Sequence, residues 1–214
     1  MRIDLIAAAV LLGFFLTVRL QTATVLLLAV LLHEGGHLLA AKWLRIRVSE
    51  IRLGLLGARM EVRQILSYRQ EWLLAAAGPA AGFLGALFAL PFWRFGFWQT
   101  FCVVSFGLSL LNLLPVQTFD GGRMLACHLA QTWGQAIAGI ILRRLSFCVL
   151  FLLWCFSVYL LLRAGSGLSW LGFSVSLLLG FFEEKTPALP AISPAFAKEK
   201  QRKTEKSKEK AKEL

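Results

Sequence analysis

A long apolar segment near the start of the chain contains three ionisable residues, and it constrains the fold more than any other feature. Residues 22–44 would form a plain membrane-spanning helix were it not for His33, Glu34 and His37. An ionisable side chain in a bilayer costs on the order of 3 kcal/mol, so such residues are rare there and usually functional. The cluster therefore indicates a functional site inside a membrane protein.

The spacing of these residues predicts a metal site. Positions four apart lie on one face of a helix, so His33 and His37 can bind the same ion. Glu34 follows one step round the helix, where its carboxylate can reach a water molecule bound to that ion. This is the His-Glu-x-x-His pattern of zinc hydrolases, in which the glutamate is the general base.

Composition supports a membrane protein. The chain has 214 residues, of which 57% are hydrophobic, and a mean hydropathy of +0.67. These values are too high for an ordinary soluble domain of this size. We predict one membrane domain over residues 1–182, beginning with a retained span and not with a cleaved signal peptide. Residues 183–214 combine prolines with a Lys/Glu run and predict a charged cytoplasmic tail that is disordered.

The expected fold class is an all-α polytopic membrane protein with about six transmembrane helices. Each span is compared with the roughly 20 residues needed to cross the hydrocarbon layer. A less apolar stretch, residues 121–138, predicts an interfacial helix between the fourth and fifth spans. The six predicted spans are residues 3–18, 22–44, 71–92, 97–114, 145–162 and 168–182.

Residues 46–65, between the second and third spans, have a different pattern. Apolar residues alternate with others around Gly54 and Gly57, which predicts a small membrane-associated β-hairpin. An exposed edge of that hairpin would be able to pair with an extended peptide. The alternative is a connector that lies on the membrane surface.

Basic residues predict the orientation. The net charge is +11, and the basic residues flank the apolar spans, which favours a bilayer with anionic lipids as the partner and not nucleic acid. An even number of spans places most of these residues on one side. The positive-inside rule then puts both termini in the cytoplasm and the two histidines in the cytoplasmic half of the membrane.

A hydrolytic zinc site has three protein ligands and an open position, so one ligand remains to be found. Asp120 is the strongest candidate, because it follows the fourth span at the same side of the membrane as the end of the second. The alternative role for Asp120 is the N-cap of the helix that follows. His128 is more simply explained as an interfacial histidine than as a ligand.

These motifs together resemble the site-2 protease family of intramembrane zinc metalloproteases. The resemblance rests on residues 33–37, on the Gly78-Pro79 segment, on Asn112 to Pro115 and on Asp120 with its two following glycines. It covers about residues 1–182. The absence of an inserted PDZ domain and the six-span layout are most similar to the sporulation branch, which processes a sigma-factor precursor. The chain departs from the family pattern at Gly82 and Thr118, where a polar residue and a proline are common.

The resemblance implies a zinc-dependent endopeptidase with His33, His37 and Asp120 as ligands and Glu34 as the base. It also implies that Asn112 holds the substrate or the oxyanion. The expected substrate is a membrane-anchored protein cut within or near its transmembrane segment, for example a sigma or anti-sigma factor. A regulatory membrane protein is a further candidate partner, and the bacterial cell membrane is the expected location. Two alternatives are a catalytically inactive relative and a metal-binding membrane transporter.

Overall fold

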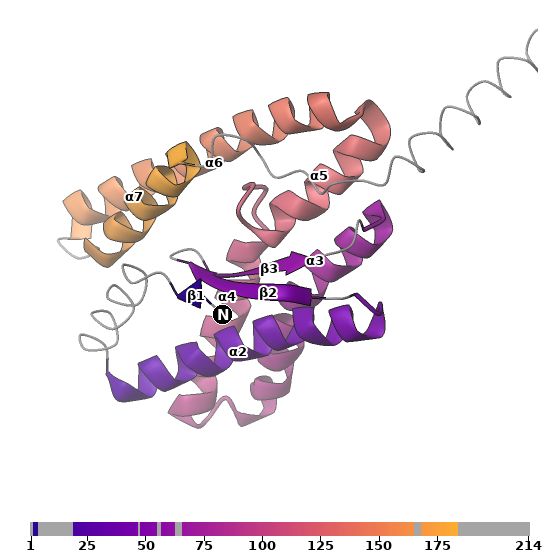
Figure 1. The fold of residues 1–214 in the computed structure, drawn as a ribbon. Helices are drawn as coiled ribbons and strands as arrows, with labels where there is room; N and C mark the ends of the chain where they lie inside the picture. The colour runs from indigo at the N-terminus through magenta and orange to yellow at the C-terminus, as the bar shows by residue number, and fades with distance from the viewer. Residues whose placement is uncertain are drawn as a thin grey trace, which may run out of the picture.

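The computed structural model describes residues 2–3, 19–46, 48–54, 57–62, 66–164 and 168–183. Almost all of the predicted first span and the tail from residue 184 lie outside these residues. The described part is mostly helical (Figure 1). Its helices are α2 (Leu20–Trp43), α3 (Tyr68–Ala89), the short η1 (Leu90–Phe92), α4 (Gly96–Asn112), α5 (Asp120–Trp133), α6 (Gln135–Ala164) and α7 (Leu168–Glu183).

Three helical segments of the described residues are long and apolar enough to cross a membrane: Leu20–Trp43, Tyr68–Phe92 and Gln135–Arg163. Helix α4 has 17 residues and is also apolar, and a shorter apolar helix covers Leu171–Phe182. A complete set of six spans stays a prediction. The predicted interfacial helix ends earlier than expected, because Gly134 has a φ of 85° and closes α5.

The predicted fifth span began too late in the chain. Helix α6 starts at Gln135, whereas the apolar pattern placed the start at Leu145. The reason is that Arg143 and Arg144 lower the hydropathy of this stretch without disfavouring a helix, since arginine is a good helix former. Hydropathy therefore located the most apolar part of the helix and not its full length.

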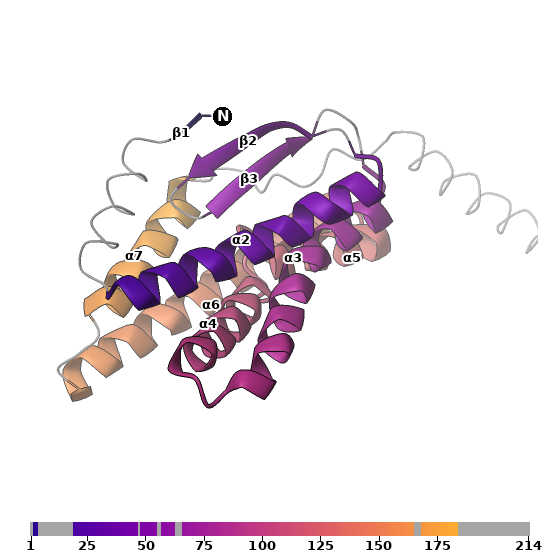
Figure 2. The same ribbon diagram turned by 90° about the horizontal axis from the view of Figure 1, so that it is seen from below.

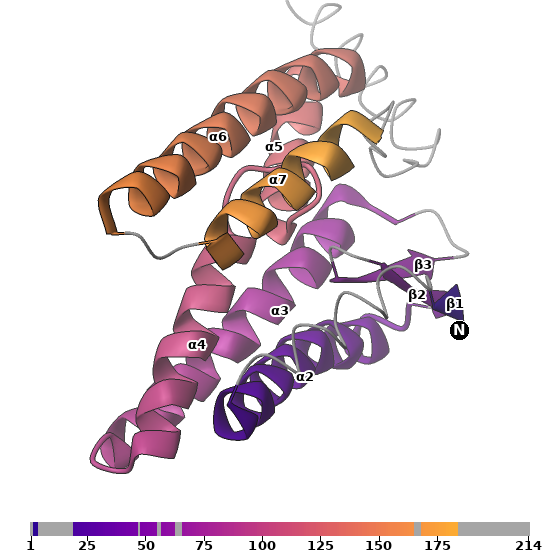
Figure 3. The same cartoon turned by 90° about the vertical axis from the view of Figure 1, so that its left-hand side faces the viewer.

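Helices α2, α3 and α4 pack side by side, with α3 in contact with both neighbours (Figure 3). Helix α5 packs against α3 and leads into α6, which pairs with α7. Two close contacts explain how α2, α3 and α4 approach one another. A Cβ atom at Gly36 would lie 2.5 Å from the carbonyl oxygen of Ala77, and Ser105 on α4 donates a hydrogen bond to the Gly82 carbonyl at 2.9 Å. Small residues at helix contacts are typical of membrane proteins.

Large apolar side chains lie exposed along several helices, including Leu31 and Leu39 on α2 and Leu152 and Leu162 on α6. Exposed apolar surface of this extent is unusual for a soluble monomer and is expected where lipid covers a protein. The buried core between α2, α3 and α4 is made instead of smaller groups and aromatic rings: Val25, Ala29, Ala86, Ala89, Phe101 and Cys102.

Three strands lie to one side of the helices, along α2 (Figure 2). Strand β2 (Val48–Gly54) pairs antiparallel with β3 (Gly57–Val62), and the two-residue β1 (Arg2–Ile3) pairs parallel with β2. The pairing falls in the segment where period-two alternation was found. Residues 55–56, which join β2 to β3, lie outside the described residues, so the membrane-associated hairpin stays a prediction.

Candidate metal centre

One buried stripe on α2 carries both histidines. Its members lie at every fourth position: Val25, Ala29, His33, His37 and Ala41. The residues around the stripe are mostly exposed leucines, so the apolar sequence buries one face of α2 against protein and leaves the other faces open. His33 and His37 are 4% and 6% exposed. They lie about 20 Å and 26 Å along the helix from its first residue, nearer to its C-terminal end, at 1.5 Å per residue.

A compact loop between α4 and α5 brings Asp120 to the histidines. The loop folds so closely on the start of α5 that a Cβ at Gly121 would overlap the backbone of Leu113, and one at Gly122 would overlap the carbonyl of Val116. The two glycines after Asp120 are therefore required by packing. Ser146 on α6 also holds the loop, because its hydroxyl accepts a hydrogen bond from the Gln117 amide at 2.9 Å.

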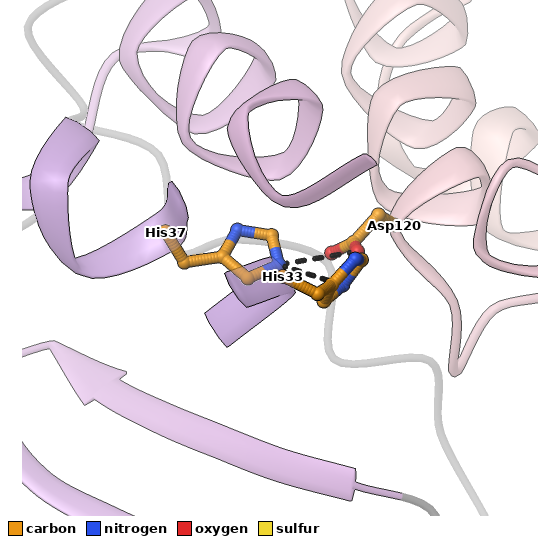
Figure 4. Close-up of side chains that lie close together, drawn as sticks. All are labelled: His33, His37 and Asp120. Carbon is orange, nitrogen blue, oxygen red and sulfur yellow. Dashed lines mark hydrogen bonds and ion pairs between the residues drawn. The ribbon is translucent and has the colours of Figure 1, made fainter. Parts of the chain in front are cut away.

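Asp120 is the first residue of α5 and not its N-cap, which is Phe119. The N-cap alternative is therefore wrong. The carboxylate of Asp120 points away from its own helix and toward α2 (Figure 4). It is 7% exposed.

Three donor atoms converge at this point. Asp120 Oδ2 lies 3.1 Å from His33 Nε2 and 3.2 Å from His37 Nε2, and the two Nε2 atoms are 3.2 Å apart. These three residues form a group of buried side chains that could hold a metal ion, since the ligand atoms all lie within 4.8 Å of one another.

The donor set and its spacing fit zinc. Two imidazole nitrogens and a carboxylate oxygen are zinc ligands, with bonds of about 2.0–2.2 Å, and tetrahedral ligands at that distance lie about 3.3 Å from one another. The separations of 3.1–3.2 Å between the donor atoms are close to this value. Three protein ligands also leave one tetrahedral position for water or substrate, as in catalytic zinc sites.

Helix α3 forms one wall of the centre. The Nδ1–H of His37 donates to the Leu74 carbonyl at 2.8 Å, and Nε2 of the same ring faces Asp120. Metal-bound histidines commonly make such a bond through the other ring nitrogen. Gly78, one turn further along α3, lies directly against the rings, and a Cβ there would be 2.8 Å from His33 Nε2. The Gly78-Pro79 segment thus contacts the centre.

Two charged residues that the sequence did not single out, Glu71 and Arg123, form an ion pair beside Asp120. Arg123 donates to the Glu71 carboxylate from Nε at 3.0 Å and from Nη2 at 2.6 Å, and its Nη1 lies 3.6 Å from Asp120 Oδ1. Burial raises the pKa of Asp120. Three neighbours oppose that effect: His33 and His37 through hydrogen bonds, His37 also through its charge, and Arg123 through its charge. Together they lower the pKa of Asp120 to about 2. The carboxylate is therefore ionised at neutral pH.

The remaining predicted residues lie as follows. Glu34 is partly buried on α2, between the two histidines in sequence. Asn112 is the last residue of α4, and its amide donates to the Leu108 carbonyl at 3.0 Å. His128 is exposed on α5 and is not a member of the metal-binding group. The sequence near Glu71 gives no sign of its contact with Arg123, because the two residues are 52 positions apart.

Fold and site together define a mostly helical chain, with helices suited to a membrane, that encloses a buried His₂Asp donor group. Comparisons with known proteins agree with that class. The model of peptidase family M50 matches residues 21–97, a range that contains His33, Glu34, His37 and Gly78.

Two relatives extend the comparison. A curated protein of Synechocystis sp. named "Putative zinc metalloprotease sll0528" is 28% identical over an alignment of 169 residues, and the match covers 74% of this chain. The chain spans only 40% of the length of that relative. The solved structure of the site-2 protease from Methanocaldococcus jannaschii is similar with a TM-score of 0.66 at 20% identity, covering 84% of this chain and 86% of that one. The chain therefore has the fold of that protein over most of its length.

Proposed function

We propose that this chain is a zinc-dependent intramembrane endopeptidase of the site-2 protease type. The observation that carries the proposal is a buried triangle of donor groups: His33 and His37, on a helix apolar enough to cross a membrane, and Asp120 at the start of α5. The match to peptidase family M50 and the likeness to a zinc metalloprotease support it. The substrate would be a membrane-anchored protein, cut within or near its transmembrane segment.

His33, His37 and Asp120 would hold the zinc ion. A zinc ion held there would lower the pKa of a water molecule toward about 7 and would polarise the scissile carbonyl. Glu34 accepts the proton of the attacking water and delivers it to the leaving amine, which is the role of a general base and then a general acid. Its position on α2, one residue after His33, would let its carboxylate reach the centre.

Substrate binding is assigned to the polar end of α4 and to the open face of α2. The Asn112 amide carries two N–H groups, one of which donates to Leu108, so the other is available to a substrate carbonyl or to the developing negative charge. Gly35 has no neighbour within 4 Å of where a Cβ would be, which leaves room beside Glu34 for a peptide backbone. The substrate helix has to unwind there, since a helical backbone hides its carbonyls.

We further propose the membrane setting. Residues 1–182 would form the protease domain, with six spans and both termini in the cytoplasm of a bacterial cell, and residues 183–214 a charged tail. The site would then lie in the cytoplasmic half of the bilayer. The hairpin at 46–65 would lie at the membrane. The similarity to the sporulation branch favours a sigma-factor or anti-sigma-factor substrate, with a regulatory membrane protein as a further partner.

The proposed reaction is tested with the Glu34→Gln variant and a tethered reporter substrate in membranes. We expect cleavage to fall at least 10²-fold, the usual contribution of a general base, with one zinc per chain retained. His128→Gln is the matched control, because this exposed histidine lies outside the centre. This variant should keep wild-type cleavage and one zinc per chain. Cleavage by Glu34→Gln at the wild-type rate would refute the proposed role of Glu34.

The orientation is tested separately. A reporter inserted between α2 and α3, within residues 47–65, should be read from the cytoplasm, and so should one fused after residue 183. A reporter signal from the opposite side at either position would overturn the proposed topology. The same Glu34→Gln variant, used as a trap in native membranes, would retain bound substrates for identification by mass spectrometry.

A further inference from the structure

Helix α3 carries a buried carboxylate close to its N-terminal end. Glu71 is 7% exposed and lies in the first turn of α3. An isolated carboxylate in such a place costs several kcal/mol, because it loses its hydration. Glu71 is compensated by Arg123 of α5, whose Nε and Nη2 atoms both reach Glu71 Oε1, at 3.0 and 2.6 Å.

Arg123 meets a second carboxylate with its remaining nitrogen. Its Nη1 lies 3.6 Å from Oδ1 of Asp120, three residues earlier on the same helix. The other oxygen of Asp120, Oδ2, faces His33 and His37 at 3.1 and 3.2 Å. The two oxygens of Asp120 are therefore divided, with one directed to the histidines and one to the guanidinium.

The location of Arg123 is unfavourable without these partners. A cation in the first turn of a helix opposes the helix dipole, and Arg123 is the fourth residue of α5. Two carboxylates offset that cost, and the planar guanidinium fixes the direction of each contact better than a lysine would. Residues that contact a metal ligand from outside the site commonly fix its orientation, and Arg123 is placed to do so for Asp120.

We propose that Glu71 and Arg123 are positioning residues that fix the Asp120 carboxylate with Oδ2 toward the two histidines. Glu71 holds the guanidinium, and the guanidinium holds Oδ1. The inference rests on the proposed role of Asp120 as a metal ligand. The competing explanation is a clamp between α3 and α5 that has no effect on the metal centre.

The test measures metal binding by the full chain in lipid nanodiscs. Zn²⁺ affinity is obtained by competition with a chelating dye, and the ligand geometry is followed by the visible spectrum of the Co²⁺-loaded protein. The variants are Arg123→Gln, Glu71→Gln and the double variant. Arg144→Gln is the matched control, because Arg144 is an exposed arginine on α6. Thermal unfolding without metal reports the clamp contribution separately.

We expect Arg123→Gln to bind Zn²⁺ about 10- to 100-fold more weakly, as is usual for partners of metal ligands, and to change the Co²⁺ spectrum. Glu71→Gln should weaken binding less. The double variant should bind no more weakly than Arg123→Gln alone, because Glu71 acts through Arg123 and the two effects are coupled. Arg144→Gln should match the wild type.

Wild-type Zn²⁺ affinity and an unchanged Co²⁺ spectrum in folded Arg123→Gln would overturn the inference, and so would independent losses that multiply in the double variant. Where Arg123→Gln does not fold, Glu71→Gln decides, because its amide keeps the shape and the acceptor oxygen. An unchanged spectrum and affinity there would equally overturn it. A wild-type chain that binds no zinc would refute the proposed function instead.

Discussion

Replacing Gly78 with alanine should disable the metal centre through a single added methyl group. A Cβ at Gly78 would lie 2.5 Å from His37 Cε1 and 2.8 Å from His33 Nε2, whereas ordinary contacts at a Cβ are 3.4–4 Å. The overlap with Nε2 of His37 is closer still. The rings or α3 must therefore move by at least about 0.9 Å, while zinc bonds of about 2.0–2.1 Å tolerate changes of only about 0.2 Å.

Movement of α3 cannot relieve the overlap cheaply. The Leu74 carbonyl, one turn before Gly78, accepts the hydrogen bond from His37, and Gly36 of α2 lies directly against the Ala77 carbonyl of α3. Displacing α3 breaks both contacts, while displacing the rings separates their nitrogens from Asp120. A shift of about 1 Å at a reacting centre costs on the order of 10²-fold in rate.

The assay is zinc content of the purified variant, measured by mass spectrometry, together with reporter cleavage in membranes. We expect Gly78→Ala to lose most of its zinc and at least 10²-fold in cleavage rate. Gly107→Ala on α4 is the matched control, because a Cβ there meets nothing within 4 Å. Wild-type zinc content in Gly78→Ala would refute the packing geometry described for α3 and the centre.

Three other changes test the centre and the loop that supports it. Asp120→Ala should reduce zinc content strongly, since only His33 and His37 remain as ligands, and unchanged content would point to a different third ligand. A zinc chelator should abolish reporter cleavage and added Zn²⁺ should restore it; activity that persists with the metal removed would exclude a zinc mechanism. Ser146→Ala should lower the free energy of unfolding by about 0.5–1.5 kcal/mol, the usual net contribution of one hydrogen bond, and should also slow cleavage. Ser174→Ala removes a hydroxyl that donates to the Leu171 carbonyl within α7 and should leave cleavage unchanged.

The helices could be predicted from the sequence because their signal is local. The boundaries of α2, α3 and α4 lie within three residues of the expected ones when η1 is counted with α3. The pairing of His33 with His37 follows from helix geometry alone. Asp120 was within reach of prediction because an incomplete ligand set and the expected membrane depth limited the candidates to few residues.

The contacts that support the centre had no such signal. Glu71 looked like the polar start of a span, and Arg123 like one more basic residue at the membrane boundary. Their pairing depends on how α3 packs against α5, which no periodicity in the sequence specifies. The same holds for Ser146, whose hydroxyl reaches a loop 29 residues away in sequence. Gly78 was recognised by resemblance, but its contact with the histidine rings required the structure.

The stripe on α2 sets a limit on how this helix can change in evolution. Its buried members lie four residues apart from Val25 to Ala41, and one inserted residue would rotate everything beyond it by about 100°. An insertion between Ala29 and His33 would turn the histidines toward lipid while leaving the composition of the helix almost unchanged. The exposed leucines can therefore be exchanged for other large apolar residues, whereas the number of residues between Val25 and Ala41 cannot vary. Homologues should differ in the lengths of their loops and agree in this count.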